Sequence, residues 1–288
     1  MISIEERINY YMGSSLSRKE KPELAQTGYD VPIELNLELY KENYRIIHPN
    51  TAYPVDVVRY LKCAAGRKLI IQCGDSPCTH TSWPVLVKTR DQQSGGVIAN
   101  LNSVRHWGEV FKHPDTLWKH KKNECVWRGA DTGGSPRLDF VKRFHGNHNI
   151  GFSSFVQDAL RTPDRYPHHF QKPPETITSM LTYKYLPVIN GNDKSSSLGW
   201  VLGSNSVPLM PEPRFHSWLC EPWLHAGTHF VEIKDDYSDF EEKLQWCKDN
   251  DDKCKEIAQN GKEFMLQFTN PPRESYIEEK LIDRVICL

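Results

Sequence analysis

Strands and amphipathic helices alternate between Glu124 and Phe268, and this alternation restricts the possible folds of the 288-residue chain more than any other feature. The apolar pattern predicts strands at 124–129, 183–189, 206–210 and 228–233, helices at 135–144, 195–204, 238–250 and 250–268, and a helical turn at 215–219. A helix between two strands returns the chain to the same end of the sheet, so the strands can pair in parallel. We therefore predict an α/β fold with helices covering a parallel sheet.

The remaining parts of the chain carry weaker patterns. Strands are expected at 68–73 and 96–101, and a terminal helix at 274–286. Residues 145–182 are rich in Pro and His and are predicted to be irregular. A capping box at Ser238 and Glu241 is expected to begin the helix at 238–250.

Charge and hydropathy exclude two classes of partner. The formal net charge is −1, which gives no electrostatic reason to expect nucleic acid. Mean hydropathy is −0.61, and no apolar run approaches the roughly 18–20 residues of a membrane span. The N-terminal residues lack the apolar stretch of a signal peptide. We expect no membrane span and a cytoplasmic location.

The eight cysteines predict reduced, mostly buried thiols, because no CxxC pair occurs. Cys73, Cys78 and His80 form at most part of a metal site, so no metal is expected. Cys247 and Cys254 are expected to share a helix face about 10 Å apart, too far for a disulfide.

Two glycine- and serine-rich loops fall where predicted strands end. The segment 127–137, WRGADTGGSPR, has glycines, a helix start that Ser135 can cap, and the cations Arg128 and Arg137, all of which suit a phosphate. The second loop follows the strand at 183–189 and places Ser195, a possible helix cap, near a diphosphate or ribose. The alternatives are a glycine-rich connection with solvated arginines and an ordinary capped helix.

Asp75 directly follows the strand at 68–73 and could serve as a general base for a hydroxyl. The alternative is an aspartate that initiates a turn before Ser76 and Pro77. Asp91 and Asp56 are the next candidates for a base in this half of the chain.

These motifs together resemble glycosyltransferase family 90, which contains capsule-associated proteins and protein O-glucosyltransferases. The resemblance covers roughly residues 121–268 and rests on WRGA at 127–130, on YKYLPVINGNDKSSSLGWVLGSNSVPLM, on the aromatics of 214–236, and on SDFEEKLQW with the later IAQNGKEF. The N-terminal half matches mainly through KLIIQCGDSP at 68–77.

The resemblance implies a GT-B fold, in which two Rossmann-like domains face each other across a cleft. It implies an acceptor-side domain at 1–120, a nucleotide-sugar-binding domain at 121–268 and a C-terminal helix at 269–288. Asp75 would be the catalytic base. The residues implied to bind the donor are Arg128, Gly129, Ala130, Arg137, Asn192, Ser195, Ser196, Ser197 and His229.

The implied activity is inverting transfer of xylose or glucose from a UDP-sugar to a hydroxyl of a glycan or protein, without cofactor or metal. A retaining transferase, or a catalytically weak protein that binds UDP-sugars or carbohydrates, is the alternative. The resemblance also implies a cytoplasmic enzyme of the short bacterial or viral type, in the host cytoplasm if a virus encodes it.

The chain departs from the family pattern at two positions. Relatives usually have an Arg where Ser197 stands, and Lys194, Arg137 or Arg214 could supply the missing charge. The segment 222–230 is longer than the usual PWxHY, so His225 and His229 compete for one role, and we favour His229.

Overall fold

The structure, a computed structural model, describes the chain except for residues 14–15, 17–20, 44–51 and 80–81. The chain forms two compact units. The first contains Met1–Gly108, Arg214–Pro222 and Gln267–Leu288, and the second contains Glu109–Pro213 and Trp223–Leu266. The predicted ranges 1–120, 121–268 and 269–288 follow sequence order, whereas these units do not.

The second unit is built on a five-stranded sheet in the order β11-β9-β8-β6-β7. Its strands are β6 (Lys122–Ala130), β7 (Asn149–Ser154), β8 (Tyr183–Pro187), β9 (Val207–Met210) and β11 (Val231–Glu232). All four neighbouring pairs are parallel. The predicted parallel α/β arrangement is therefore confirmed for this unit.

The sheet has one strand that the sequence pattern did not predict. β7 lies within residues 145–182, which were expected to be irregular, and that expectation is wrong for 149–154 and for the short helices at 158–161 and 177–180. The strand has only a short apolar run, and it is stabilised by pairing along the whole carboxyl half of β6, from Val126↔Asn149 to Ala130↔Ser154. Pairing with a distant segment overrides the weak local preference.

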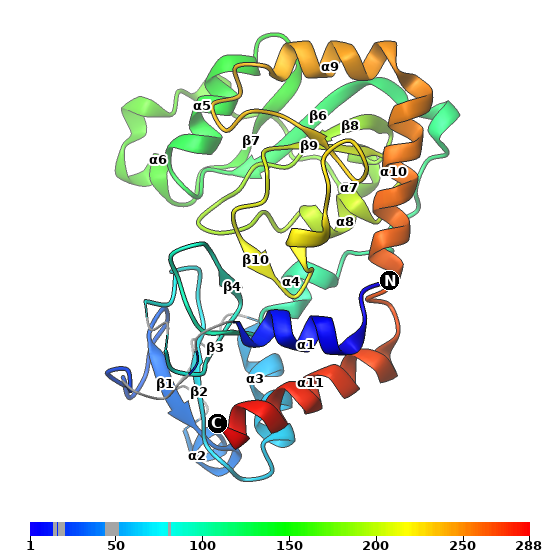
Figure 1. Ribbon diagram of the computed structural model, residues 1–288. Coiled ribbons are helices and arrows are strands. Elements are labelled where there is room, and N and C mark those ends of the chain that lie inside the picture. Colours follow the sequence, from blue (N-terminus) through cyan, green and yellow to red (C-terminus); the bar gives the residue numbers. More distant parts are fainter. Residues whose placement is uncertain (14–15, 17–20, 44–51, 80–81) are drawn as a thin grey trace. The chain divides into compact units, whose positions relative to one another are not determined.

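Helices cover both faces of this sheet (Figure 1). They are α5 (Ser135–Phe144), α6 (Asp158–Arg161), α7 (Ile177–Met180), α8 (Leu198–Leu202), α9 (Phe240–Asp249) and α10 (Asp251–Leu266). α5 and α9 share one face, where the ring of Phe240 lies 5.2 Å from Phe140 and 4.5 Å from Phe144. Along the sheet, the connection from β6 through α5 to β7 runs one way and the connection from β8 through α8 to β9 runs the other way. Because such connections between parallel strands are right-handed, α5 and α8 lie on opposite faces of the sheet.

Three predicted helix caps are wrong. Ser135 is the first residue of α5, and Gly134 is its N-cap. Ser197, not Ser195, precedes α8. α9 has Asp239 as its N-cap without a side-chain hydrogen bond, so the box at Ser238 does not form. In each case the strand end and the following loop fix where the helix begins.

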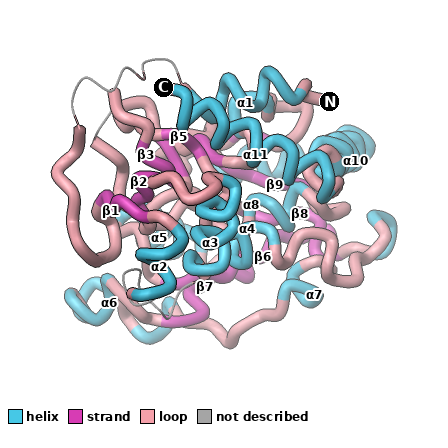
Figure 2. The backbone as a smooth tube through the Cα atoms, turned by 90° about the horizontal axis from the view of Figure 1, so that it is seen from below, coloured by secondary structure: helices cyan, strands magenta, loops and turns pink. Residues whose placement is uncertain are grey.

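The first unit holds a smaller sheet in the order β1-β2-β3-β5 (Figure 2). Its elements are α1 (Ile4–Met12), β1 (Pro32–Leu35), α2 (Leu37–Glu42), α3 (Tyr53–Cys63), β2 (Leu69–Gln72), β3 (Val85–Val87), β4 (Thr89–Arg90), β5 (Val97–Ile98), α4 (Ser103–Trp107), β10 (His216–Ser217) and α11 (Pro271–Cys287). β1 is antiparallel to β2, whereas β2, β3 and β5 are parallel. β2 and β5 confirm the strands expected at 68–73 and 96–101.

Distant stretches of sequence complete the first unit. α1 and α11 run side by side (Figures 1 and 2), and the buried guanidinium of Arg7 pairs with both carboxylate oxygens of Glu274, at 2.5 and 2.7 Å. Tyr11 stacks on Trp218 with ring centroids 4.2 Å apart. The helical turn predicted at 215–219 is wrong, because His216 and Ser217 form β10 and pair with β4.

The prediction that Cys247 and Cys254 share a helix face is wrong. Cys247 and Cys254 do not share a helix: α9 ends before Asn250, and the Cys254 thiol reaches the carbonyl oxygen of Cys247 at 3.5 Å. Cys73 and Cys78 are buried, and His80 lies outside the described residues.

No helix in the described part of the chain combines the length and apolarity that crossing a membrane requires.

Candidate functional site

The carboxyl edge of the second unit's sheet has a topological switch point between β6 and β8. From β6 the chain moves to β7 on one side, and from β8 it moves through β9 to β11 on the other. In open parallel sheets, ligands bind at the carboxyl ends of the two neighbouring strands from which the chain leaves in opposite directions. The loops here are residues 131–134 after β6 and 188–197 after β8, and the second contains four of the nine residues predicted to bind a donor: Asn192, Ser195, Ser196 and Ser197.

Arg137, in α5, joins these two loops through hydrogen bonds. Its buried guanidinium donates to the carbonyl oxygens of Ala130, Ile189 and Asn190 at 3.0–3.2 Å. It also donates to the hydroxyl of Thr132 at 2.8 Å. These acceptors lie at the ends of both strands, so Arg137 positions the edge of the sheet, and its predicted contact with a donor stays a prediction.

Two glycines allow the loops to touch backbone to backbone. A Cβ atom on Gly133 would lie 2.3 Å from the carbonyl carbon of Gly191. A Cβ atom on Gly191 would lie 3.0 Å from the Thr132 hydroxyl oxygen. Gly133 and Gly134 also have φ values of 84° and 67°, which favour glycine. The contact between the loops therefore requires glycine at position 133, and the backbone conformation favours glycine at 134.

The second loop brings its predicted residues to the same edge. Asn192 is exposed, and its Oδ1 accepts from the Gly133 amide at 2.9 Å. The hydroxyls of Ser195 and Ser197 lie 2.9 Å apart, and Ser195 is buried. Ser196 and Ser197 are partly exposed, and Lys194 beside them is buried. Small hydroxyl groups and a lysine thus gather at the start of α8.

The side chain of Arg128 bonds to residues outside these two loops. Its guanidinium donates to the carbonyl oxygens of Trp127, Asn149 and Pro173 at 2.9 Å, and to Asn149 Oδ1 at 2.7 Å. Asn149 is the first residue of β7, so the side chain reaches toward the amino end of that strand. Burial lowers the pKa of the guanidinium. This geometry joins β6 to its neighbours, and the predicted donor contact remains untested.

His229 is likewise not at the carboxyl edge, because it lies two residues before β11 begins. Its Nδ1 accepts from the backbone N–H of His225 at 3.0 Å, and the two rings lie 5.8 Å apart. Burial, reinforced by His225, lowers the pKa of His229. The choice between these histidines stays open, since both occupy one turn.

Gly129 and Ala130 are the last residues of β6. A Cβ atom on Gly129 would lie 2.5 Å from the ring of Trp127, so that packing requires glycine. The pairing of β6 with β7 shifts register between Gly129 and Ala130. These two residues therefore shape the strand end that leads into the first loop.

The prediction from sequence missed a third loop at this edge. Residues 155–159 follow β7, and three polar side chains link them to the other loops: Asp131, Gln157 and Asp158. Because β7 was not predicted, nothing in the sequence placed this loop beside the others. Asp131 stands within the ADTGG segment of the first loop, and the sequence analysis gave it no role.

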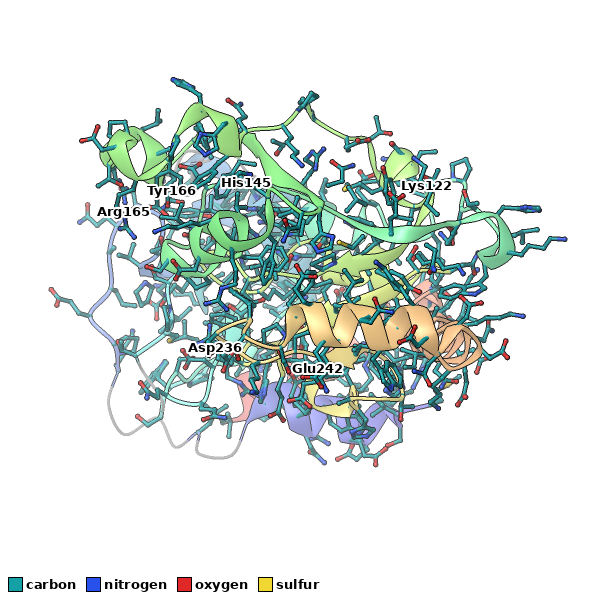
Figure 3. All side chains as sticks on the ribbon, turned by 90° about the horizontal axis from the view of Figure 1, so that it is seen from above. Lys122, His145, Arg165, Tyr166, Asp236 and Glu242 are labelled. Carbon is teal, nitrogen blue, oxygen red and sulfur yellow. The ribbon has the colours of Figure 1, made fainter. Side chains whose placement is uncertain are left out.

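A hollow of about 560 Å³ opens along α5 beside this edge. Its lining residues are Ser135, Pro136, Asp139, Lys142, Arg143, Asp235, Asp236 and Tyr237. Asp236 lies near the start of α9 in Figure 3, and its carbonyl oxygen accepts from Arg143 at 2.7 Å. The hollow therefore has a charged rim of both signs and a volume within the roughly 300–1,000 Å³ of small-molecule sites.

In the first unit, Asp75 follows β2 and Lys88 follows the parallel neighbour β3. The buried ammonium of Lys88 donates to the partly exposed carboxylate of Asp75. The other two candidate carboxylates hold local structure instead. Asp56 is fully buried and accepts from Ser103, and Asp91 accepts two backbone N–H groups of its own turn.

Comparison with known proteins shows which family this architecture belongs to. The model of glycosyl transferase family 90 matches residues 99–271. The O-glucosyltransferase LpsA of Dichelobacter nodosus is 32% identical over 195 residues, 66% of this chain and 58% of that protein. Protein O-glucosyltransferase 3 of Rattus norvegicus is 32% identical over 245 residues, 85% of this chain and 44% of that protein.

A viral relative is also similar. Protein 027R of Frog virus 3 is 26% identical over 197 residues, 56% of this chain and 20% of that protein. The chain thus spans between a fifth and three fifths of the lengths of these relatives. The family model covers more than half of the chain and includes the strand ends and loops described above for the second unit. The resemblance seen in the sequence is confirmed, and the chain belongs to glycosyltransferase family 90.

Proposed function

We propose that this protein transfers a sugar, xylose or glucose, from a UDP-sugar to a hydroxyl group of a glycan or protein. The observation that carries the proposal is the switch-point edge between β6 and β8 in a chain of this family. The relatives from Dichelobacter nodosus and Rattus norvegicus both have O-glucosyltransferase names, which supports glycosyl transfer. The GT-B arrangement implied by the family resemblance is part of the proposal.

The donor is assigned to the second unit. Its diphosphate would bind at the starts of α5 and α8, where backbone N–H groups and the helix dipole favour an anion. The hydroxyls of Ser195, Ser196 and Ser197 would contact phosphate or ribose. Of the three cations that could supply the positive charge missing at Ser197, we assign it to Lys194, because Lys194 stands on the same loop as the three serines.

The acceptor base is assigned to Asp75. In an inverting displacement the acceptor oxygen attacks the anomeric carbon, its proton passes to the Asp75 carboxylate, and the bond from that carbon to UDP breaks. Negative charge then gathers on the leaving diphosphate, where the helix starts and Lys194 would stabilise it without a metal. Lys88 would hold the Asp75 carboxylate in place.

Incubation with a panel of UDP-sugars and hydroxyl acceptors, with mass spectrometry of the products, tests this proposal. The expected result is a glycosylated acceptor with UDP released and the anomeric configuration inverted. Retained configuration would establish the retaining alternative on the same fold. UDP-sugar binding without any product across the panel would instead support a binding protein, an alternative that Ser197 favours by removing one phosphate contact.

A further inference from the structure

The buried carboxylate of Asp131 has a role that the proposed transfer does not use. Asp131 directly follows β6 and is only 1% exposed. It accepts the backbone N–H groups of Val156 and Ala159, both at 2.5 Å, and that of Gln157 at 3.1 and 3.2 Å. A buried carboxylate is costly unless it is hydrogen-bonded, and here three donors from one loop satisfy it. Asp131 therefore fixes the backbone of the loop after β7.

The loop fixed in this way contacts the two loops of the switch point. Asp158 accepts the Gly134 N–H at 2.7 Å. Gln157 accepts from the side-chain amide of Asn192 at 3.2 Å, and Asn192 in turn accepts the Gly133 N–H at 2.9 Å. One hydrogen-bonded network therefore joins the loops after β6, β7 and β8.

Gly133 and Gly134 have no side chains that could fix the direction of their backbone N–H groups. Gly133 and Gly134 have positive φ values and no side chain, so many backbone conformations are open to them. A Cβ atom added to Gly134 would lie 3.9 Å from the Asp158 carboxylate oxygen, an ordinary contact, so close packing does not hold this residue. Acceptors on other loops therefore help to fix the direction of both N–H groups.

We propose that Asp131 is a positioning residue of the donor edge, acting through Gln157 and Asp158. It holds the backbone that carries these two side chains, so that the Gly133 and Gly134 amides and the Asn192 side chain keep one arrangement before the donor arrives. Preorganisation of this kind lowers the entropy lost on binding. The inference rests on the proposed function only in assigning a UDP-sugar to this edge.

The first test needs no substrate. Asp131→Asn keeps the size of the side chain but turns an amide N–H₂ toward backbone N–H groups. Hydrogen exchange followed by mass spectrometry should become at least about tenfold faster at 156–159 and also at Gly133 and Gly134. Asp164→Asn, at an exposed position of the same segment, is the matched control and should leave exchange unchanged.

The second test uses steady-state kinetics with UDP-glucose or UDP-xylose, whichever the wild-type protein turns over. Asp131→Asn should raise the donor KM about tenfold and leave kcat within about threefold, because the edge is disordered before binding and restored in the complex. Gln157→Ala keeps the buried carboxylate and breaks only the link to Asn192. It should raise the donor KM and speed exchange at Gly133, even if Asp131→Asn fails to fold.

The outcomes separate this inference from the proposed function. Fast exchange at 156–159 with wild-type exchange at Gly133 and Gly134, in Asp131→Asn, would overturn the positioning role. A wild-type protein that neither binds UDP nor transfers sugar would overturn the proposed function, and the exchange measurement would still decide on Asp131. A fall in kcat with unchanged donor KM would also contradict the inference.

Discussion

The Lys88 ammonium donates a hydrogen bond to the Asp75 carboxylate at the carboxyl ends of two neighbouring parallel strands. Lys88 is 4% exposed, so the charge of Asp75 has a buried partner on one side while the carboxylate remains partly open. A fixed carboxylate with one accessible side suits a general base, because proton transfer requires hydrogen-bond reach. Asp30 accepts the N–H of Ser76, the residue after Asp75, at 2.7 Å, so a second aspartate also holds this turn.

Replacing Asp75 with Asn should abolish most of the activity. Asn keeps the shape but cannot take the acceptor's proton, so turnover should fall by roughly 10²–10⁴-fold while UDP affinity stays unchanged. Kinetics and calorimetry measure the two effects. Asp283→Asn, at an exposed position of the same unit, is the control. A folded variant that retains more than about a tenth of the rate would exclude Asp75 as the base.

Arg128→Ala should destabilise the protein rather than weaken donor binding. Removing the guanidinium leaves three carbonyl oxygens without this donor, which should lower the free energy of unfolding by about 1–3 kcal/mol. Denaturant unfolding measures this loss, with the exposed Arg165→Ala as the control. Unchanged stability together with weaker UDP binding would instead establish the donor contact predicted from the sequence.

Lys194→Met should weaken UDP binding. The substitution keeps the apolar stem and removes the ammonium that we assign to the diphosphate. Loss of one charge-assisted contact should reduce affinity on the order of 10- to 100-fold in calorimetry. Lys119→Met, exposed in the same unit, should have no effect. Equal UDP affinity in the Lys194 variant would leave the charge missing at Ser197 without a replacement.

Metal removal should not stop transfer. If the helix starts and Lys194 stabilise the leaving diphosphate, the rate in excess EDTA should equal the untreated rate. Product formation measured before and after chelation checks this expectation. Loss of activity in EDTA and its recovery with manganese would contradict metal-independent transfer.

The buried carboxyl of Glu278 should make the free energy of unfolding depend on pH. The pKa of this carboxyl is raised to about 7, chiefly by burial and also by the charges of Asp56 and Glu274, although Arg59 at 2.9 Å lowers it. A raised folded-state pKa gives stability that is full below the unfolded value of 4.5 and is lost as pH rises through about 7. This group should therefore lower the free energy of unfolding between those pH values, by at most about 1.4 kcal/mol per pH unit.

Denaturant unfolding across this pH range tests the assignment. Glu278→Gln should flatten the decline relative to wild type, because the variant has no proton to lose at this position. The exposed Glu279→Gln should keep the wild-type slope. Parallel curves for wild type and Glu278→Gln would show that Glu278 does not titrate in this range.

Local sequence determined which segments of the second unit form most strands and helices. The apolar runs at 183–187 and 207–210 and the amphipathic stretches of α9 and α10 carry their own periodicity, so their positions were predictable. The same holds for β2, after which Asp75 was found where it was expected. The motifs at 127–137 and 190–197 identified the family before any fold was known.

Tertiary structure decided the features whose stabilising partners are distant in sequence. β7 and β10 are strands because β6 and β4 offer unpaired backbone groups to them, which no local pattern records. α11 joins the first unit because Ile277, Leu281 and Val285 are buried there and Glu274 pairs with Arg7. Arg128 and Arg137 looked alike as phosphate ligands in the sequence. Only the folded chain shows the carbonyl oxygens that each guanidinium satisfies, because a buried donor must bond to whatever acceptors the packing places within reach.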